Sequence, residues 1–324
     1  RVELTFINDG VTEQLAVVLK AQVPDSRTLD VGSEVAKLCS PELGDAWQTH
    51  RARNEVCRGH LREAAIYTLE DEQIALHRPT LYGAAPGLLV IEDLTGMPML
   101  NSAERHGWGD GEIAAAIEGI AAVHANWLGA PPVAPWLPPA RACAEQQSLW
   151  DALADVALAQ PFGRSLGESG AARYEYLLGE VDGWSSVEEA MPQTLIHNDF
   201  NPRNVAIRPD GRLCAYDWEL ARVGLPQRDL AEFLCFTLDP EVTEETLSHW
   251  VEFHRAALER GTGRTVDERQ WRLGFGAALA DFMVTRLPLY AMISRFHPQP
   301  FLDRVVRTWV SIDRLLGFDI EAPR

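Results

Sequence analysis

The chain has 324 residues, 46% of them hydrophobic, and a formal net charge of −18. This length allows one large bilobal domain or two smaller ones, and the absence of any run of about 18 apolar residues argues against a membrane span. The acidic charge argues against a nucleic-acid-binding surface and leaves two interpretations open: a field that favours a cationic substrate, or solubility alone.

The cysteines bear on the cellular compartment, and the lysines on where a compact positive charge is needed. Five cysteines are scattered along the chain, and no two form a C-x-x-C pair. This pattern predicts reduced thiols in a cytoplasmic protein, without a disulfide framework or a zinc site. The first residues are not typical of a signal peptide. Only Lys20 and Lys37 of the 29 basic residues are lysines, which suggests that these positions need a compact ammonium rather than a planar guanidinium.

The first 40 residues predict β structure. Residues 2–6 and 14–19 flank Asn8-Asp9-Gly10, a hairpin turn signal. Residues 34–38 are a third short strand candidate. We therefore expect an antiparallel sheet with Lys37 on its last strand.

A helix and a buried strand follow. Residues 61–69 contain good helix formers with apolar residues near helical spacing. The apolar run 88–91 predicts a buried strand, which ends at the polar turn 92–96. We take this turn as the boundary between two lobes.

Beyond that turn the pattern is mostly helical. A helix is expected to open at Asp110, with apolar residues along one stripe, and a proline-rich connector follows at 131–139. Another helix is expected to begin at Asp229. Further helical patterns lie at residues 143–158, 170–190, 243–260, 267–295 and 300–316.

The chemistry concentrates between residues 195 and 219. Asp199 and Asn204 are five positions apart, so one loop can present both side chains to the same cavity. Two short strands, 205–207 and 213–216, joined by a turn at 209–211, return the chain so that Asp217 lies beside Asn204. Two carboxylates and an amide arranged in this way can hold a divalent metal against phosphates while an Asp receives a proton from a hydroxyl.

Three motifs follow one another in this part of the chain: His197-x-Asp199-x4-Asn204, Asp217-Trp218-Glu219 and Gly224-Leu225-Pro226-x-x-Asp229. They resemble the aminoglycoside phosphotransferase and choline kinase superfamily. The segments Arg62-Glu63-x-x-Ile66-Tyr67 and Ile91-Glu92-Asp93-Leu94 look more like its ecdysteroid-kinase-like branch. The resemblance spans roughly residues 1–240. It departs from the family in lacking a G-x-G-x-x-G loop and in having Asn198 where many relatives have Gly.

The resemblance implies an α+β, protein-kinase-like bilobal fold. A small β-rich N-terminal lobe with one main helix would comprise residues 1–95, and a larger, mostly helical lobe residues 96–324. It also implies transfer of the γ-phosphoryl group of ATP, with Mg²⁺, to a hydroxyl of a small aminoglycoside-, amino-alcohol- or sugar-like acceptor.

The resemblance further implies roles for the central motif. Asp199 matches the catalytic base, and Asn204 and Asp217 match the magnesium ligands. His197 is expected to brace the catalytic loop by hydrogen bonds, and Asp229 to cap a helix beside it.

For the nucleotide, the resemblance implies that Lys37 contacts the α and β phosphates and pairs with Glu63. Lys20 is the competitor for the lysine and Glu55 the runner-up for the carboxylate. The backbone of Glu92, Asp93 and Leu94 is the expected hinge that reads the adenine edge.

Other functions stay open at this point. They are a nucleotide-binding pseudokinase or regulator, a metal-dependent hydrolase using His197 and Asp199, and a protein kinase, although little room for an activation segment follows Asp217. Asp281 and Glu244 are conceivable acceptor contacts. No nucleic-acid or membrane partner is expected, and the acceptor and the oligomeric state are left open.

Overall fold

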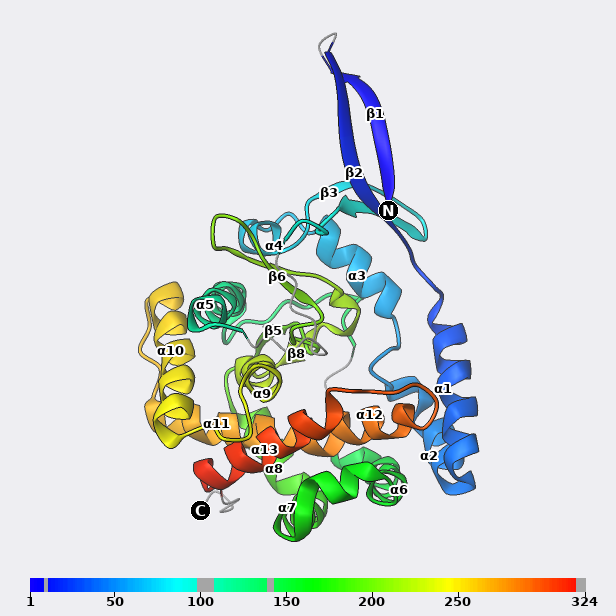
Figure 1. The fold of residues 1–324 in the computed structure, drawn as a ribbon, viewed down its shortest axis with the longest axis vertical. Coiled ribbons are helices and arrows are strands. Elements are labelled where there is room, and N and C mark those ends of the chain that lie inside the picture. Colours follow the sequence, from blue (N-terminus) through cyan, green and yellow to red (C-terminus); the bar gives the residue numbers. More distant parts are fainter. Residues whose placement is uncertain (9–10, 98–107, 139–142, 319–324) are drawn as a thin grey trace.

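The computed structural model describes residues 1–8, 11–97, 108–138 and 143–318. A small sheet lies at one end of the molecule, above a larger body of helices (Figure 1). The strands are β1 (Val2–Asn8), β2 (Val11–Ala21), β3 (Leu81–Ala85), β4 (Leu88–Glu92), β5 (Thr194–Ile196), β6 (Val205–Ile207), β7 (Leu213–Ala215) and β8 (Arg222–Gly224).

Helices make up most of the rest. The α-helices are α1 (Asp25–Cys39), α2 (Pro41–Thr49), α3 (Gly59–Thr68), α4 (Glu72–His77), α5 (Asp110–Trp127), α6 (Gln147–Leu158), α7 (Pro161–Gly179), α8 (Val181–Ala190), α9 (Pro226–Thr237), α10 (Glu244–Thr262), α11 (Glu268–Asp281), α12 (Leu287–Ser294) and α13 (Leu302–Leu316). Short helical turns are η1 (Arg51–Arg53), η2 (Ala144–Gln146), η3 (Trp218–Leu220) and the π-helical η4 (Phe282–Arg286).

The N-terminal sheet is antiparallel, with strand order β1-β2-β4-β3. The strands predicted at 2–6, 14–19 and 88–91 are confirmed, and β1 pairs with β2 as a hairpin whose turn residues, 9–10, lie outside the described residues. Lys20 lies on β2 opposite Leu89 of β4. The sheet therefore carries Lys20 on β2. The neighbouring strand, β4, leads into the expected hinge.

The strand predicted at residues 34–38 is wrong, because this segment is the last part of helix α1. Pro24 and Asp25 open the helix, a combination that suits a helix N-terminus. Leu29, Ser33 and Ala36 are buried at helical spacing, so the 3.6-residue period decides the structure here. Lys37 consequently lies on a helix and not in the sheet.

The sheet is followed by elements that agree with the sequence patterns. Helix α3 confirms the prediction at 61–69, and β6 pairs with β7 as the expected antiparallel hairpin. Strand β5, which leads into the central motif, pairs with β8. Helix α9 begins three residues earlier than expected, at Pro226, and Asp229 lies in its first turn.

The helical body surrounds a continuous apolar core. The helices expected from residue 110 onward are present as α5 to α13, with a kink at Gly167 inside α7. Within the described residues, the stretch Glu268–Ser294 is long and apolar enough to cross a membrane, but 89% of its most apolar window is buried inside the protein. It therefore serves as a central core helix of the body.

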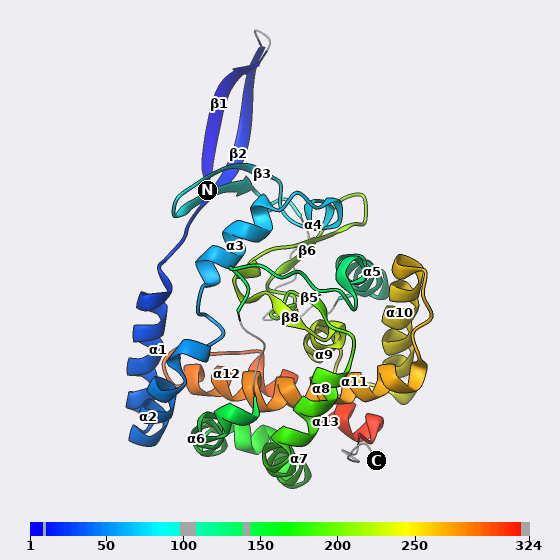
Figure 2. The same cartoon turned by 180° about the vertical axis from the view of Figure 1, so that it is seen from behind.

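The predicted α+β class is confirmed, with a small β-rich part above a larger helical part (Figure 1). Helices α1 and α2 do not stay with the sheet. They form a pair that packs against α12 and α6 of the helical body (Figure 2). The lobe boundary near residue 95 stays a prediction, with residues 25–49 lying against the larger part.

Candidate active site

A buried carboxylate holds the loop that carries the central motif. The loop leaves β5 at His197, and the backbone N–H groups of His197 and Asn198 each donate a 2.7 Å hydrogen bond to Asp229. Asn198 has a positive φ of 62°, a left-handed conformation in which Asn is tolerated better than most residues. Burial alone would raise the pKa of Asp229, but the hydrogen bond and charge of His124 outweigh it and lower the pKa. An ionised Asp229 thus fixes the turn before Asp199.

His197 braces the same loop from its other side. Its ring Nε2 lies 2.9 Å from the backbone carbonyl oxygen of Tyr216, and its ring packs on Trp218 with 4.4 Å between centroids. These contacts tie the loop after β5 to the end of β7. They agree with the bracing role expected for His197.

Asp199 is surrounded by hydrogen-bond donors. Nδ2 of Asn204 donates to Oδ2 at 2.7 Å, while Nδ2 of Asn201 and the hydroxyl of Tyr290 donate to Oδ1 at 3.0 and 3.1 Å. The structure therefore brings Asp199 and Asn204 into direct contact. The donors to Asp199 come from its own loop and from α12.

Two guanidinium groups set the charge of this carboxylate. Arg203 lies 3.8 Å and Arg286 4.0 Å from Asp199 Oδ1. Burial alone would raise the pKa of Asp199, but Arg286 and then Arg203 outweigh it and lower the pKa. The carboxylate is therefore ionised at neutral pH and can accept a hydrogen bond from a hydroxyl.

Asp217 returns beside Asn204, as the hairpin predicted. The backbone N–H of Tyr216 donates to the carbonyl oxygen of Asn204 at 2.9 Å, and Asp217 follows with a positive φ of 66°. This left-handed residue turns the chain out of β7 and into η3. The hairpin thus places the loop amide and the second carboxylate at the same edge.

The lysine beside these carboxylates is Lys20. Its ammonium lies 2.6 Å from Glu63 Oε1 and 2.6 Å from Asp217 Oδ1. Burial alone would lower the pKa of Lys20, but Asp217 and Glu63 outweigh it and raise the pKa. Strand β2, helix α3 and the β7 hairpin therefore meet at one charged lysine.

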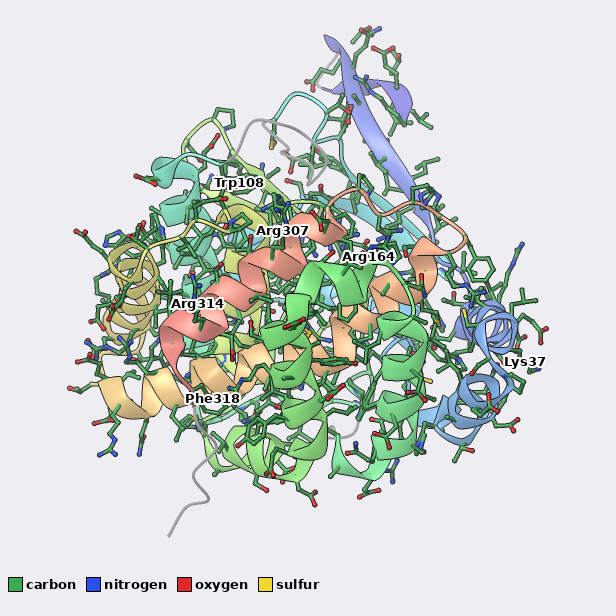
Figure 3. All side chains as sticks on the ribbon, turned by 60° about the horizontal axis from the view of Figure 1, so that its bottom comes forward. Lys37, Trp108, Arg164, Arg307, Arg314 and Phe318 are labelled. Carbon is green, nitrogen blue, oxygen red and sulfur yellow. The ribbon has the colours of Figure 1, made fainter. Side chains whose placement is uncertain are left out.

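The predicted pairing of Lys37 with Glu63 is wrong. Lys37 lies on α1, away from the sheet, and the ammonium of its half-exposed side chain pairs with Glu34 at 2.9 Å (Figure 3). Glu63 instead accepts a hydrogen bond from Lys20, the competing lysine, at 2.6 Å. Glu55, the alternative carboxylate, instead pairs with Arg286 at 2.7 Å.

The expected hinge lies directly after β4. Glu92 pairs with Arg208 through two 2.8 Å hydrogen bonds, and Asp93 accepts hydrogen bonds from Thr95. Leu94 is buried in a small cluster with Ala206 and Cys214 from the β6–β7 hairpin. The side chains of Glu92 and Asp93 are thus occupied by contacts within the protein.

Several residues of the site had no sequence signal. Tyr290, 91 positions away in the chain, and Arg286 reach Asp199 from an apolar helical stretch. Arg203 is different, because it lies inside the central motif, directly before Asn204, and that position is a signal in the sequence. Asp281, considered as an acceptor contact, is fully buried and pairs with Arg228 at 2.8 Å.

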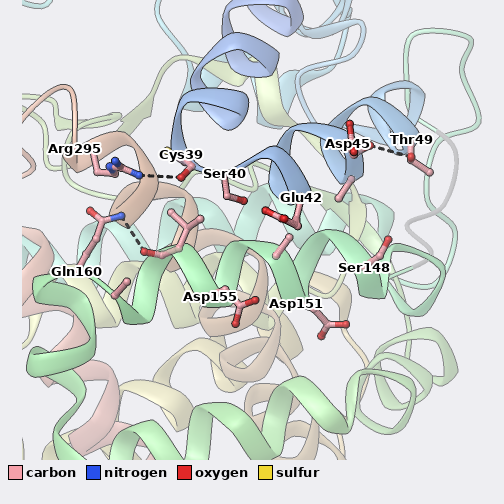
Figure 4. A pocket seen from close by; sticks show the side chains of 14 residues that line it. Cys39, Ser40, Glu42, Asp45, Thr49, Ser148, Asp151, Asp155, Gln160 and Arg295 are labelled. Carbon is pink, nitrogen blue, oxygen red and sulfur yellow. Dashed lines mark hydrogen bonds between the residues drawn. The ribbon is translucent and has the colours of Figure 1, made fainter.

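Three cavities adjoin this site. One of about 390 Å³ is lined by Arg286 and Tyr290, one of about 370 Å³ by Asn198, and one of about 180 Å³ by Lys20 and Glu63. A further cavity, of about 910 Å³, is an acidic groove between α2 and α6 (Figure 4). In the described part of the chain, none of its lining residues hydrogen-bonds Asp199, Asn204 or Asp217, so it is separate from the site.

Comparison with known proteins identifies the family of the chain. A model of the phosphotransferase enzyme family matches residues 29–264. No curated protein matches the chain. The family match confirms the expected superfamily, and the ecdysteroid-kinase-like branch stays a prediction.

Solved structures of low identity are similar to this chain. Choline kinase LicA from Streptococcus pneumoniae is 14% identical over 76% of this chain and 77% of that chain, with a TM-score of 0.47. An aminoglycoside phosphotransferase from Alicyclobacillus acidocaldarius is 13% identical over 97% and 89%, with a TM-score of 0.48. The macrolide 2'-phosphotransferase MphH from Brachybacterium faecium is 15% identical over 92% of each chain, with a TM-score of 0.40.

Proposed function

The chain belongs to the phosphotransferase enzyme family, and on this premise we propose that it transfers the γ-phosphoryl group of ATP to a hydroxyl of a small molecule. The observation that carries the proposal is the convergence of Lys20, Glu63 and Asp217 beside the loop of Asp199 and Asn204. Phosphoryl transfer depends mainly on positioning and charge stabilisation, which such a set supplies.

Asp199 acts as the base. It accepts a hydrogen bond from the acceptor hydroxyl, orients it, and takes its proton as the oxygen bonds to the γ-phosphorus. The bond from that phosphorus to the β–γ bridging oxygen breaks, and ADP leaves. A positioned base contributes roughly 10²–10⁴-fold, and the lowered pKa of Asp199 keeps the carboxylate ionised, so that it can accept the hydrogen bond from the hydroxyl.

Asn204 and Asp217 would hold Mg²⁺. One carboxylate and one amide supply hard oxygen donors, and phosphate oxygens and waters would complete the shell. The donor set fits, because the two residues are neighbours at the end of the β6–β7 hairpin and Asp217 already faces a cation, Lys20. When bound, the metal would neutralise charge on the phosphates.

Lys20 contacts the α and β phosphates in this proposal. Glu63 is 2% exposed and holds the ammonium in place from α3. The backbone at Glu92, Asp93 and Leu94 reads the adenine edge, at the boundary between lobes comprising residues 1–95 and 96–324. Leu94, Ala206 and Cys214 offer an apolar surface next to it.

A small acceptor fits the chain after Asp217. The segment forms η3 and then β8, which pairs with β5, and α9 begins at Pro226. This short, paired connection has no long activation segment that could bind a peptide. The acceptor is therefore a small molecule and not a protein.

Calorimetry and product analysis test this function together. ATP titrated into the protein should bind more tightly with Mg²⁺ than with EDTA, and ADP should form faster when an acceptor alcohol is added. A protein that binds neither ATP nor ADP with Mg²⁺ contradicts the proposal. Tight ATP binding without transfer to any alcohol would indicate a pseudokinase instead.

A further inference from the structure

An apolar cavity is lined by two residues, Arg286 and Tyr290, that also contact the proposed base. It has a volume of about 390 Å³ and lies between the helix pair α1–α2, the segment 53–56, α6 and α12. Most of its lining is apolar or aromatic; the main side chains are Val31, Val35, Trp47, Trp150, Leu289 and Phe296. Ligand sites are commonly cavities of this size and character.

The cavity reaches Asp199 through two shared residues. Tyr290 lines it and donates its hydroxyl hydrogen to Asp199 at 3.1 Å, and Arg286 lines it at 4.0 Å from the same carboxylate. A molecule in the cavity can therefore bring a hydroxyl to Asp199 past Tyr290. The cavity is placed to hold an acceptor.

The charges of the lining do not suit a polycation. Its charged residues are Arg53, Glu55 and Arg286. Glu55 already pairs with Arg286 at 2.7 Å, and Arg53 pairs with Glu145. Among the described residues that line the cavity, the sole carboxylate is therefore committed, and an amine placed against this lining would lose water without gaining an ion-pair partner from it.

The helix pair that walls the cavity is tightly packed. A Cβ on Gly32 would lie 2.8 Å from the ring of Trp47, and a Cβ on Gly44 would lie 2.5 Å from Cγ of Lys37. Small residues at both positions let α1 and α2 approach closely, so Trp47 is held against the cavity. The helix pair stands in the chain between the strand of Lys20 and the helix of Glu63.

The mouth of the cavity is apolar as well. Val31 is 58% exposed, Phe296 50% and Ile293 38%, and all three line the cavity. Val31 comes from α1, Ile293 from the end of α12, and Phe296 from just after α12. Exposed apolar groups gathered at one opening favour an apolar ligand.

We propose that the acceptor is an apolar alcohol, whose hydrocarbon or aromatic body fills this cavity and whose hydroxyl faces Asp199. The inference rests on the proposed function and gives its acceptor class. The hydroxyl proton passes to Asp199, the oxygen bonds to the γ-phosphorus, and ADP leaves. The products are ADP and the phosphate monoester of the alcohol.

Calorimetry without nucleotide tests the cavity independently of catalysis. The probes are hexanol, octanol and decanol, with kanamycin and ethanolamine as polar amines. We expect affinity to rise about threefold to fourfold for each added methylene that is buried, and the amines to bind more weakly than octanol. Tighter binding of kanamycin than of octanol, or no binding of any alcohol, overturns the inference.

Two variants on one helix locate the binding. Val31→Glu places a charge at the mouth, and Leu38→Glu is the matched control, since Leu38 is 67% exposed on the same helix and does not line the cavity. Octanol affinity should fall at least about fivefold in Val31→Glu and stay unchanged in Leu38→Glu. Equal affinities in the two variants overturn the inference.

The proposed function fails separately. If ATP does not bind with Mg²⁺, the kinase proposal is wrong, whatever the alcohols do. If ATP binds and kanamycin or ethanolamine is phosphorylated while octanol is not, the apolar acceptor is wrong and the kinase stands. Formation of octyl phosphate that is lost in Val31→Glu and kept in Leu38→Glu supports both.

Discussion

Lys20 and Asp217 are 197 positions apart in the chain, yet Nζ of Lys20 lies 2.6 Å from Oδ1 of Asp217. The lysine belongs to the N-terminal sheet, and the carboxylate ends the hairpin that follows the catalytic loop. Their contact joins the small β-rich part to the helical body at the proposed phosphate site. Charged groups at this junction are suited to respond when a nucleotide binds between them.

Replacing the two lysines separately tests which one serves the nucleotide. Lys20→Met should lower kcat/KM about 10²–10³-fold, because it removes a fixed positive charge from the phosphate site. Lys37→Met, on α1 and away from the sheet, should leave kcat/KM unchanged. Steady-state rates with ATP measure both, and the reverse order of effects would restore the original assignment of Lys37.

Replacing Asp199 and replacing Asp217 should impair the reaction in different ways. Asp199→Asn should keep ATP affinity and lose about 10²–10⁴-fold in kcat, since the base acts on the acceptor. Asp217→Asn should also lose binding of ATP with Mg²⁺, because it removes a metal ligand. Calorimetry and rate measurements separate the two, and equal mild losses would contradict both roles.

The pKa of Asp199 predicts the acid side of the pH profile. Because Arg286 and Arg203 outweigh burial and lower that pKa, Asp199 should stay ionised and kcat/KM should show no acid limb from it between about pH 5 and pH 8. Arg203→Leu should raise the pKa of Asp199 and move an acid limb toward this range. An acid limb that is identical in both proteins would count against Asp199 as the base.

A lowered carboxyl pKa also makes the stability of the fold depend on pH. A carboxyl with a lowered folded pKa contributes stability that is complete above its unfolded pKa, about 3.9 for Asp, and that is lost as the pH falls through the folded value. Asp229 is such a group. Its contribution should therefore be full at neutral pH and decline in acid below about pH 4.

Asp229→Asn tests this buried anchor directly. An amide cannot accept the hydrogen bonds from His197, Asn198 and His124 with the same charge. The free energy of unfolding at neutral pH should fall by at least about 3 kcal/mol, measured with guanidinium chloride. Asp210→Asn, at an exposed pair with Arg212, is the control and should change nothing measurable.

The local sequence pattern was sufficient to predict the hairpin that follows Asp199. The strand, turn and strand between Asn204 and Asp217 are close in sequence, so a hairpin is their expected structure and it returns the two residues to each other. The same applies to α3, where Glu63 and Tyr67 are buried one turn apart. Motif spacing thus predicted that Asn204 lies beside Asp199 and that the hairpin returns Asp217 to Asn204.

Long-range contacts decided the rest. A Val-x-Lys-Leu run suits a strand or a helix over a few residues, and the burial of Leu29, Ser33 and Ala36 against the body selects the helix, which takes Lys37 away from the sheet. The choice of Lys20 as the partner of Glu63 therefore depended on packing.

The sequence by itself determined the family, the α+β class and the loop with its carboxylates, because these follow from short spacings and motifs. Only the tertiary structure decided which lysine meets Glu63 and that Tyr290 and Arg286 face Asp199. It also decided that the cavity lined by Tyr290 and Arg286 is mostly apolar. Contacts between segments far apart in the chain depend on how whole helices pack, and no local pattern encodes them.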